Sequence, residues 1–333
     1  MIKSVMRTWN KLEQMVTCFV RKYLMFAVLG MISSCAFVNM ALHAGAGLHY
    51  YCQEECLKKA LTGPLLPLDK DIILHIRKYW IDPPAPRGSY KSDFPLENPP
   101  WASMGNWVDS PSLHLPNTRD PRNLRREILP HTANFKRGTF VEIGASDGEF
   151  KSVSLYAEQK LGFKGLLIEP NPGEYQELRA KKRSAYTVNA CASIYPGHVK
   201  NDLWIRNTPV NLPYLLYRLQ KSSNRLVKYV SQEDSGLGRT TPVQCFNVGA
   251  LTIAALKTTT IDLLAISTHG GELEILDAIP KAIKINLLVL VTPIATQDDM
   301  DLVKALTEAR DLKPIFLKYN MNIFITADRV AKA

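Results

Sequence analysis

A short segment in the middle of the chain carries the residues best suited to hold a polar ligand. An apolar, β-branched stretch, Thr139–Ile143, leads directly into a turn that contains Gly144 and Gly148. Glycine permits the backbone angles of a tight crossing from a strand to a helix. Such a turn leaves backbone N–H groups pointing outward at a helix start, where they can bind a polar group. Because glycines are common in turns of this kind, the segment alone is only weakly specific for a ligand.

The next predicted strand adds an acidic residue at a matching position. Residues 165–169 have the pattern of a second buried strand, and Glu169 ends it. In nucleotide-binding α/β domains, an acidic residue at the end of the second strand accepts hydrogen bonds from the ribose hydroxyls. The turn and Glu169 together predict a site for a nucleotide-type cofactor.

Strand-like and helix-like patterns alternate around this turn. The further predicted strands are residues 185–189, 243–246, 261–267, 285–292, 314–317 and 323–326. The predicted helices are residues 149–161, 172–182 and 248–256, a short helix from 272, and 298–310. This alternation predicts an α/β fold, with a parallel sheet of about seven strands and helices on both faces. Residues 195–242 break the rhythm, and we expect an insertion there with one helix, residues 215–230, over one edge of the site.

The first 46 residues have the pattern of a membrane anchor. Residues 1–22 hold five cations and one acidic residue, and no charged residue occurs between 23 and 46. An apolar stretch of roughly 20 residues can cross a bilayer as a helix, and the preceding cations place the N-terminus in the cytoplasm. A cleaved signal peptide is the alternative, although its apolar core usually spans only roughly 7–15 residues. We expect a cytoplasmic tail, 1–22, an uncleaved anchor, 23–46, that contacts the lipid bilayer, and the rest of the chain in the secretory pathway.

That compartment bears on the six cysteines of the chain. Cys52 and Cys56 stand one helical turn apart just beyond the anchor, which permits a local or intermolecular disulfide. Cys191 and Cys245 fall inside the predicted domain, where we expect buried free thiols rather than a disulfide. No second Cys or His pair stands at ligand spacing near Cys52, so no metal site is predicted.

Proline is frequent from residue 83 to residue 121, after a predicted helix at 68–79. Such a segment cannot sustain long helices or central strands. It also carries large aromatic side chains, which a bare linker seldom does. These are Trp80, Tyr90, Phe94, Trp101 and Trp107. Within a lumenal region, 47–134, we therefore expect a proline-rich strap that packs on the domain.

The composition is that of an ordinary globular protein, with 46% hydrophobic and 22% charged residues. The formal net charge is +10, but the basic residues are spread along the chain. Their densest group, 179–183, follows Glu174 and Glu177 on one predicted helix, and acid first and base last is the order that the helix dipole favours. No basic stripe interleaved with aromatic residues is present, so we do not expect nucleic-acid binding.

Four blocks in order resemble the FkbM-type methyltransferases: residues 140–149, 164–172, 185–193 and 261–276. The resemblance covers about residues 135–327 and leaves a short tail, 328–333. It implies a class I S-adenosylmethionine methyltransferase-like, Rossmann-like sheet with S-adenosylmethionine as the cofactor. On that resemblance the residues that would shape the cofactor site are Glu142, Gly144, Ser146, Asp147 and Gly148, and Glu169 would hold the ribose hydroxyls.

The chain departs from the family pattern after its fourth strand. The family usually has an aspartate and a glutamate there, and this chain has Ser267 and His269. Methyl transfer to a hydroxyl needs a base or a metal to help deprotonate the acceptor, and strand-end carboxylates usually supply it. His269 is a candidate base because its ordinary pKa is near neutrality, although an ordinary loop histidine is the simpler interpretation. Whether the domain is an enzyme is left open by these departures.

A short cytoplasmic tail, one anchor and a lumenal FkbM-like domain together look most like the arthropod Star proteins. That resemblance implies a non-catalytic protein that assists transport of membrane-bound cargo, such as growth-factor precursors, from the endoplasmic reticulum to the Golgi. It implies a single-pass type II protein of endoplasmic reticulum, Golgi and endosomal or plasma membranes. The alternative is a lumenal S-adenosylmethionine-dependent O-methyltransferase that acts on a glycan or a small hydroxylated acceptor.

Overall fold

The computed structural model describes residues 66–96, 137–292, 296–318 and 321–327. All of them belong to one compact unit, Lys59–Ala333. The predicted tail at 1–22, the predicted anchor at 23–46, and Cys52 and Cys56 lie outside the described residues. Within the described ranges, no helix is both long enough and apolar enough to span a membrane.

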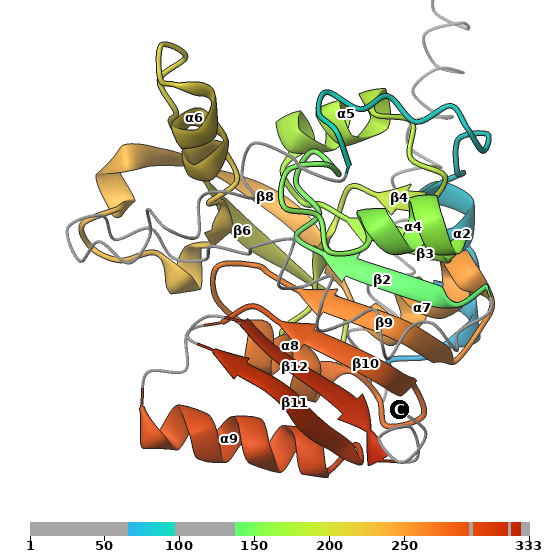
Figure 1. The fold of residues 1–333 in the computed structure, drawn as a ribbon. Helices are drawn as coiled ribbons and strands as arrows, with labels where there is room; N and C mark the ends of the chain where they lie inside the picture. The colour runs from blue at the N-terminus through green and yellow to red at the C-terminus, as the bar shows by residue number, and fades with distance from the viewer. Residues whose placement is uncertain (1–65, 97–136, 293–295, 319–320, 328–333) are drawn as a thin grey trace, which may run out of the picture. The chain divides into compact units, whose positions relative to one another are not determined.

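The main sheet has eight strands in the order β1-β4-β3-β2-β9-β10-β12-β11 (Figure 1). Their bounds are β1 (Ile81–Asp82), β2 (Thr139–Ile143), β3 (Lys164–Ile168), β4 (Tyr186–Val188), β9 (Thr260–Ile266), β10 (Lys284–Leu290), β11 (Leu312–Lys318) and β12 (Met321–Thr326). The five strands from β4 to β10 are parallel, which confirms the prediction for the centre of the sheet.

Both edges of this sheet differ from the all-parallel prediction. β12 is antiparallel to β10 and to β11, and β1 is antiparallel to β4. β11 and β12 follow each other so closely in the chain that only a hairpin can join them, and a hairpin makes its strands antiparallel. β1 comes from the segment before the domain, which the prediction placed in helix and strap.

Helices cover both faces of the central strands. One face packs against α2 (Lys70–Tyr79), α7 (Val248–Leu256), α8 (Glu272–Ala278) and α9 (Gln297–Glu308), and the other against α4 (Leu155–Leu161) and α5 (Pro172–Ala180). Alternate residues of a strand point to opposite faces. In β2, accordingly, Val141 and Ile143 belong to the first apolar core and Phe140 to the second.

The helix starts follow from short polar side chains at the first turn. Asn171 accepts a hydrogen bond from the N–H of Gly173, and Pro172 begins α5, where its missing N–H costs nothing. Thr296 forms a reciprocal capping box with Asp299 at the start of α9. Asn247 caps α7 by accepting a hydrogen bond from the N–H of Gly249. These caps explain why α5, α7 and α9 begin within one residue of their predicted starts.

The insertion is a second sheet rather than a single helix. Its four strands, in the order β5-β8-β6-β7, are β5 (Cys191–Ala192), β8 (Gly238–Phe246), β6 (Val199–Arg206) and β7 (Arg225–Leu226). The predicted helix at 215–230 is shorter in the structure. α6 (Tyr214–Lys221) is followed by β7 and the 3₁₀ turn η2 (Val227–Tyr229), and a second 3₁₀ turn, η3 (Ser235–Leu237), leads into β8. In Figure 1 this lobe lies on the side toward which the central strands point.

The prediction placed residues 243–246 in the main sheet, and it was wrong because prolines and glycines concealed a longer strand. β8 contains Pro242, which a central strand would not accept, since proline cannot donate a ladder hydrogen bond. One edge of β8 pairs with β6 from Gly238 to Cys245. The other edge pairs with β5 only at Cys245 and Phe246, so at Pro242 this second edge faces no strand. The proline therefore breaks no pairing.

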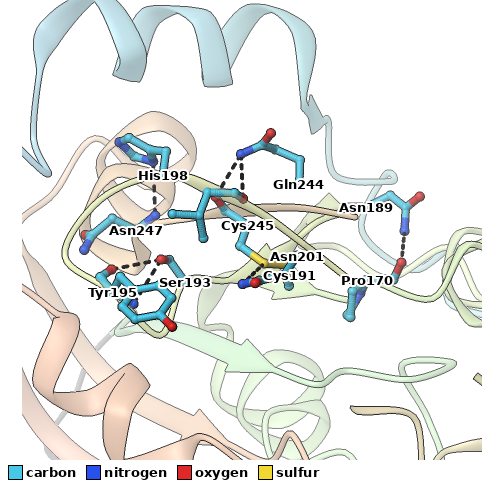
Figure 2. The surroundings of a disulfide bond; sticks show 11 residues. Pro170, Asn189, Cys191, Ser193, Tyr195, His198, Asn201, Gln244, Cys245 and Asn247 are labelled. Carbon is cyan, nitrogen blue, oxygen red and sulfur yellow. Dashed lines mark hydrogen bonds between the residues drawn. A yellow bond between two sulfur atoms is a disulfide. The ribbon is translucent and has the colours of Figure 1, made fainter. Parts of the chain in front are cut away.

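The sulfur atoms of Cys191 and Cys245 form a disulfide, shown in Figure 2. The expectation of two free thiols was therefore wrong. The two residues are directly paired across the parallel strands β5 and β8, with Cα atoms 4.3 Å apart. They are 54 residues apart in the chain, so only the strand pairing, and no local pattern, brings them together.

The first part of the proline-rich strap packs on the domain, as its aromatic residues indicate. The N–H groups of Ala85 and Lys91 donate to the carbonyls of Arg183 and Lys181. The N–H groups of Asp93 and Phe94 donate to the Glu149 carboxylate. Trp101 and Trp107 lie outside the described residues.

Replacing Cys191 and Cys245 together by serine should lower the free energy of unfolding by about 2–4 kcal/mol, because the unfolded chain loses a long cross-linked loop. Urea denaturation of the purified protein measures the change. A reducing agent serves as the control: it should lower the midpoint of the wild type and leave that of the double variant unchanged. Equal midpoints for both proteins without reductant would contradict the disulfide.

Candidate functional site

The site predicted from the sequence lies where the order of the sheet reverses direction. Chain order runs outward from β2 through β3 to β4 on one side, and continues from β9 to β10 on the other. In open α/β sheets ligands bind outside the carboxyl ends of the strands at such a switch point. The turn after β2 and the loop after β9 therefore border the place where a ligand of this fold would bind.

The glycines of the turn are required by packing. Gly144 has φ 76°, and a Cβ there would lie 1.9 Å from the carbonyl oxygen of Ser267 in the loop after β9. Gly148 also has φ 76°, and a Cβ there would lie 2.3 Å from Leu178 of α5. Ser146, between them, takes the left-handed region with φ 52°, which is uncommon outside glycine. The turn would need both glycines whether or not it binds a ligand.

The backbone N–H groups of the turn are bonded within the chain. Gly144 and Ala145 both donate to the carbonyl of Ile168, and Gly148 donates to Ala145. Ser146 donates to the Glu169 carboxylate at 2.7 Å. The sequence predicted outward-pointing donors, and at these four positions the structure differs from that prediction.

Glu142 occupies the start of the helix that follows the turn. Its carboxylate, buried on β2, accepts from the N–H and hydroxyl of Ser154, from the N–H of Val153 and from the Ser152 hydroxyl. Glu142 therefore fixes the three residues, 152–154, that lead into α4.

α4 begins at Leu155 and not at Glu149 as predicted, because Asp147 bonds the backbone at the predicted start. Asp147 Oδ1 accepts from the N–H groups of Glu149 and Phe150, so the chain forms a side-chain-bonded turn there instead of a helix.

Arg218 of α6 lies against the turn. Its Nη2 is 2.9 Å from Asp147 Oδ2, 2.9 Å from Glu174 Oε2 and 3.2 Å from the Ser146 hydroxyl. Ser146 in turn donates its hydroxyl to Glu174. The side chains of Arg218, Asp147 and Glu174 are at most 5% exposed, so this is a buried ion cluster.

The outer side of the cluster is closed by Glu177 of α5. Glu177 Oε2 lies 2.7 Å from Arg218 Nη1, and its other oxygen pairs with Lys221. Burial lowers the pKa of Arg218, but the carboxylates of Asp147, Glu174 and Glu177 more than offset it and raise that pKa above its ordinary value. The guanidinium is therefore held in its charged form.

Glu169 is buried at the end of β3, where the sequence placed it. Its two carboxyl oxygens accept from the N–H groups of Ser146 and of Asn171, at 2.7 and 2.9 Å. Burial and the neighbouring Glu174 raise the pKa of Glu169 to about 8, and the two backbone donors only partly counter them. Burial therefore favours the protonated form of this side chain.

The loop after β9 forms the opposite wall. Its carbonyl at Ser267 contacts Gly144, and Ser267 itself is buried. His269 is half-buried with φ 59°, in a run of three positive φ angles that continues through Gly270 and Gly271. The structure therefore brings His269's loop against the turn, as the sequence order implied.

Sequence reasoning missed the acid that organises this loop. Glu272, buried at the start of α8, accepts from the N–H groups of Thr268 and Gly270 at 2.9 and 3.1 Å. Burial raises the pKa of Glu272, and those backbone donors oppose the rise. Its position in the fourth block, three residues after His269, was the available signal.

Arg218 and Glu174 were missed as well, for a different reason. The sequence pattern marked Glu174 only as an acid near the start of a helix, whereas its side chain is completely buried. Arg218 lies in the insertion, where nothing in the sequence links it to the turn 72 residues earlier. Only the packed structure reveals this pairing.

The comparison with family models decides the family. Residues 142–312, just over half of the chain, match the methyltransferase FkbM domain. The chain belongs to the FkbM methyltransferase family. The matched residues include the turn, Glu169 and the loop after β9, and they lie inside the predicted domain at 135–327.

A solved structure also resembles the chain: a methyltransferase FkbM from Methylobacillus flagellatus KT. It is 14% identical in sequence, and the match covers 62% of this chain with a TM-score of 0.34. The match spans only half of that protein's chain. No curated protein matches.

The residues assigned to S-adenosylmethionine do not fit a bound cofactor in this arrangement. Ser146 and Asp147 are bonded to Arg218 or Glu174, Glu142 to the start of α4, and Glu169 to backbone donors. None of the four is more than 8% exposed. As for metal ions, the described part of the chain contains no cluster of three or more His, Cys, Asp or Glu side chains that could hold one.

Gly144→Ala should destabilise the protein far more than Gly162→Ala. Both glycines have φ near 70°, and an alanine in this region costs roughly 1–2 kcal/mol. A Cβ at Gly162 meets nothing within 4 Å, whereas at Gly144 it overlaps the Ser267 carbonyl. Thermal and urea unfolding measure both variants: the loss in Gly162→Ala reports backbone strain alone, and the additional loss in Gly144→Ala reports the overlap with the Ser267 carbonyl. Equal losses would contradict the close contact between the turn and the loop after β9.

The pKa of Glu169 makes folding take up a proton. The unfolded side chain ionises near its ordinary pKa of 4.5, and the folded one near 8. The free energy of unfolding of the wild type, relative to that of Glu169→Gln, should therefore decrease as the pH rises from 4.5 to about 8. The decrease is up to ~1.4 kcal/mol per pH unit. Urea unfolding at pH 5, 6, 7 and 8 measures the difference, with Glu308→Gln, an exposed glutamate of α9, as the control. A constant difference across this range would show that Glu169 is ionised in the folded protein.

Proposed function

We propose that this protein is a Star-like, single-pass membrane protein of the secretory pathway whose FkbM domain binds a partner instead of transferring a methyl group. The observation that carries the proposal is that Arg218, an internal cation, is bonded to Ser146 and Asp147 at the turn assigned to the cofactor. A domain that uses these groups for its own packing keeps the fold of the family without its ligand.

The chemistry of the opposite wall supports the same proposal. Methyl transfer to a hydroxyl requires a group that removes the acceptor's proton, and a carboxylate or metal usually does so. Ser267 cannot act as such a base, and Glu272 uses its carboxylate to hold the loop. His269 is the one remaining titratable side chain of this loop, residues 267–271.

Two features support placement in the secretory pathway. The apolar stretch at 23–46, with cations before it, has the pattern of a signal anchor. The disulfide between Cys191 and Cys245 suits an oxidising compartment, since disulfides are rare in the cytosol. The proposed topology is type II, with the domain in the lumen of the endoplasmic reticulum, Golgi and endosomes or outside the cell.

In this role the protein assists transport of membrane-bound cargo, such as a growth-factor precursor, from the endoplasmic reticulum to the Golgi. The lumenal domain supplies the binding surface, and the anchor keeps it in the membrane that carries the cargo. The cargo is itself anchored, so both proteins diffuse in one plane and meet without a soluble intermediate.

Topology and cargo export test this proposal. Protease treatment of sealed microsomes should leave the chain after about residue 50 intact and remove it once detergent opens the membrane. Cross-linking in cells should recover a membrane-bound cargo, and loss of the protein should retain that cargo in the endoplasmic reticulum. Digestion of the domain in sealed microsomes, or normal export of every cross-linked cargo without the protein, would sink the proposal.

A lumenal O-methyltransferase is the second candidate, favoured by the contact between His269's loop and Gly144. In that case the purified protein should transfer a radiolabelled methyl group from S-adenosylmethionine to a glycan or a small hydroxylated acceptor. His269→Ala should abolish the transfer without loss of fold. Calorimetry that detects no binding at millimolar S-adenosylmethionine would exclude this candidate.

A further inference from the structure

The insertion helix α6 holds the turn through one side chain. Arg218 reaches the Ser146 hydroxyl, the Asp147 carboxylate and the Glu174 carboxylate with a single nitrogen, Nη2. Two of these three groups belong to the segment that the family resemblance assigns to the cofactor. Arg218 comes from outside that segment, on the lobe formed by the second sheet.

α6 is attached to the domain mainly by polar contacts. Its apolar residues Leu215 and Leu219 pack with Phe150 and Phe94 in a small cluster separate from the two main cores. Tyr214 adds a ring contact with Phe94, with centroids 5.0 Å apart, and α6 also touches β6. The ion pairs of Arg218 and Lys221 with Glu174 and Glu177 complete the attachment of α6 to α5. Elements with few buried apolar contacts open locally at a lower free-energy cost than core elements.

The charges restrict what can replace Arg218. If α6 moved away, Asp147 and Glu174 would lose the guanidinium that lies 2.9 Å from each of them while Glu169 stayed beside Glu174. Buried carboxylates without a cation are strongly destabilised. A ligand of the opened turn must therefore present a positive group to Asp147 and Glu174. S-adenosylmethionine, which has an ammonium and a sulfonium group, is of that class.

We propose that α6 is an internal gate on the turn, closed by Arg218, and that a cationic ligand of the turn binds only by displacing it. The gate rests on the proposed function and deepens it, because Arg218 takes up the groups of the turn that the family resemblance assigns to the cofactor. The gate predicts two separate results: the rate of hydrogen exchange in the ligand-free protein, and the affinity of the turn for an added cationic ligand.

Hydrogen exchange of the ligand-free protein tests the gate itself. In Arg218→Met, the amides of α6 and of residues 146–150 should exchange at least about tenfold faster than in the wild type, because a buried ion pair is broken. Arg225→Met is the matched control: it removes another arginine of the insertion, which pairs with Asp234 instead of the turn. Unchanged exchange at residues 146–150 in Arg218→Met would overturn the gate.

A milder variant covers the case in which Arg218→Met loses its fold. Glu177→Gln weakens the closed state from its half-exposed side and leaves the Asp147 and Glu174 pairs in place. It should speed exchange in α6 by about twofold to fivefold, the effect of one partly exposed pair, with α4 and α7 unchanged. An equal change of the exchange rate in α6 and in α7, relative to the wild type, would also contradict the gate.

Titration with S-adenosylmethionine tests the class of ligand. Calorimetry should show binding to Arg218→Met at least about tenfold tighter than to the wild type, since the ligand no longer competes with the guanidinium. Tighter binding to the wild type would make Arg218 a ligand-holding residue and overturn the gate. No binding to either protein would exclude this cofactor as the ligand, with the exchange result still deciding the gate. Methyl transfer by the wild type would contradict the non-catalytic function without changing the exchange result.

Discussion

The pairing of one buried guanidinium with two buried carboxylates is the interaction on which the candidate site depends. A charge removed from water is costly unless an opposite charge and hydrogen bonds compensate it. Arg218 meets this need with Asp147 from the turn after β2 and Glu174 from α5, and they in turn depend on it. Three elements far apart in the sequence are thus stabilised together. The site is a structural joint in this state, and any ligand has to compete with the protein's own contacts.

These contacts change how the glycine-rich turn and Glu169, two features of the family resemblance, are interpreted. Gly144 is a glycine because the Ser267 carbonyl lies against it, and the buried Glu169 side chain accepts hydrogen bonds from two backbone N–H groups. Both residues would be under the same physical constraint in a domain that binds no cofactor. A glycine-rich turn and a strand-end acid therefore report how two loops pack, and the presence of a ligand has to be argued from other groups.

Sequence patterns predicted the parts that local chemistry controls. The alternation of strands and helices gave the parallel centre of the sheet, and side-chain caps such as Asn171 and Thr296 set the helix starts. Most of the misses come from pairing between distant residues, and the late start of α4 comes in part from a local turn at Asp147. Neither the second sheet, nor the Cys191–Cys245 bond, nor Arg218 beside Asp147 leaves a local pattern, and α4 starts late because Glu142 and Asp147 take donors that a helix would have used. The predicted residues do lie at the turn after β2 and at the end of β3, but the sequence did not show that they are bonded to Arg218, Glu174 and backbone donors.

The disulfide has a consequence for how the chain survives damage. It joins β5, which directly follows the main-sheet strand β4, to the end of β8, which directly precedes α7. The whole lobe between them, including α6 and its loops, is thereby a covalently closed ring. A single cut by a protease anywhere in that ring leaves both halves of the domain bonded, so the main sheet keeps all of its strands. The exposed lobe can thus be nicked without releasing the fold that it covers.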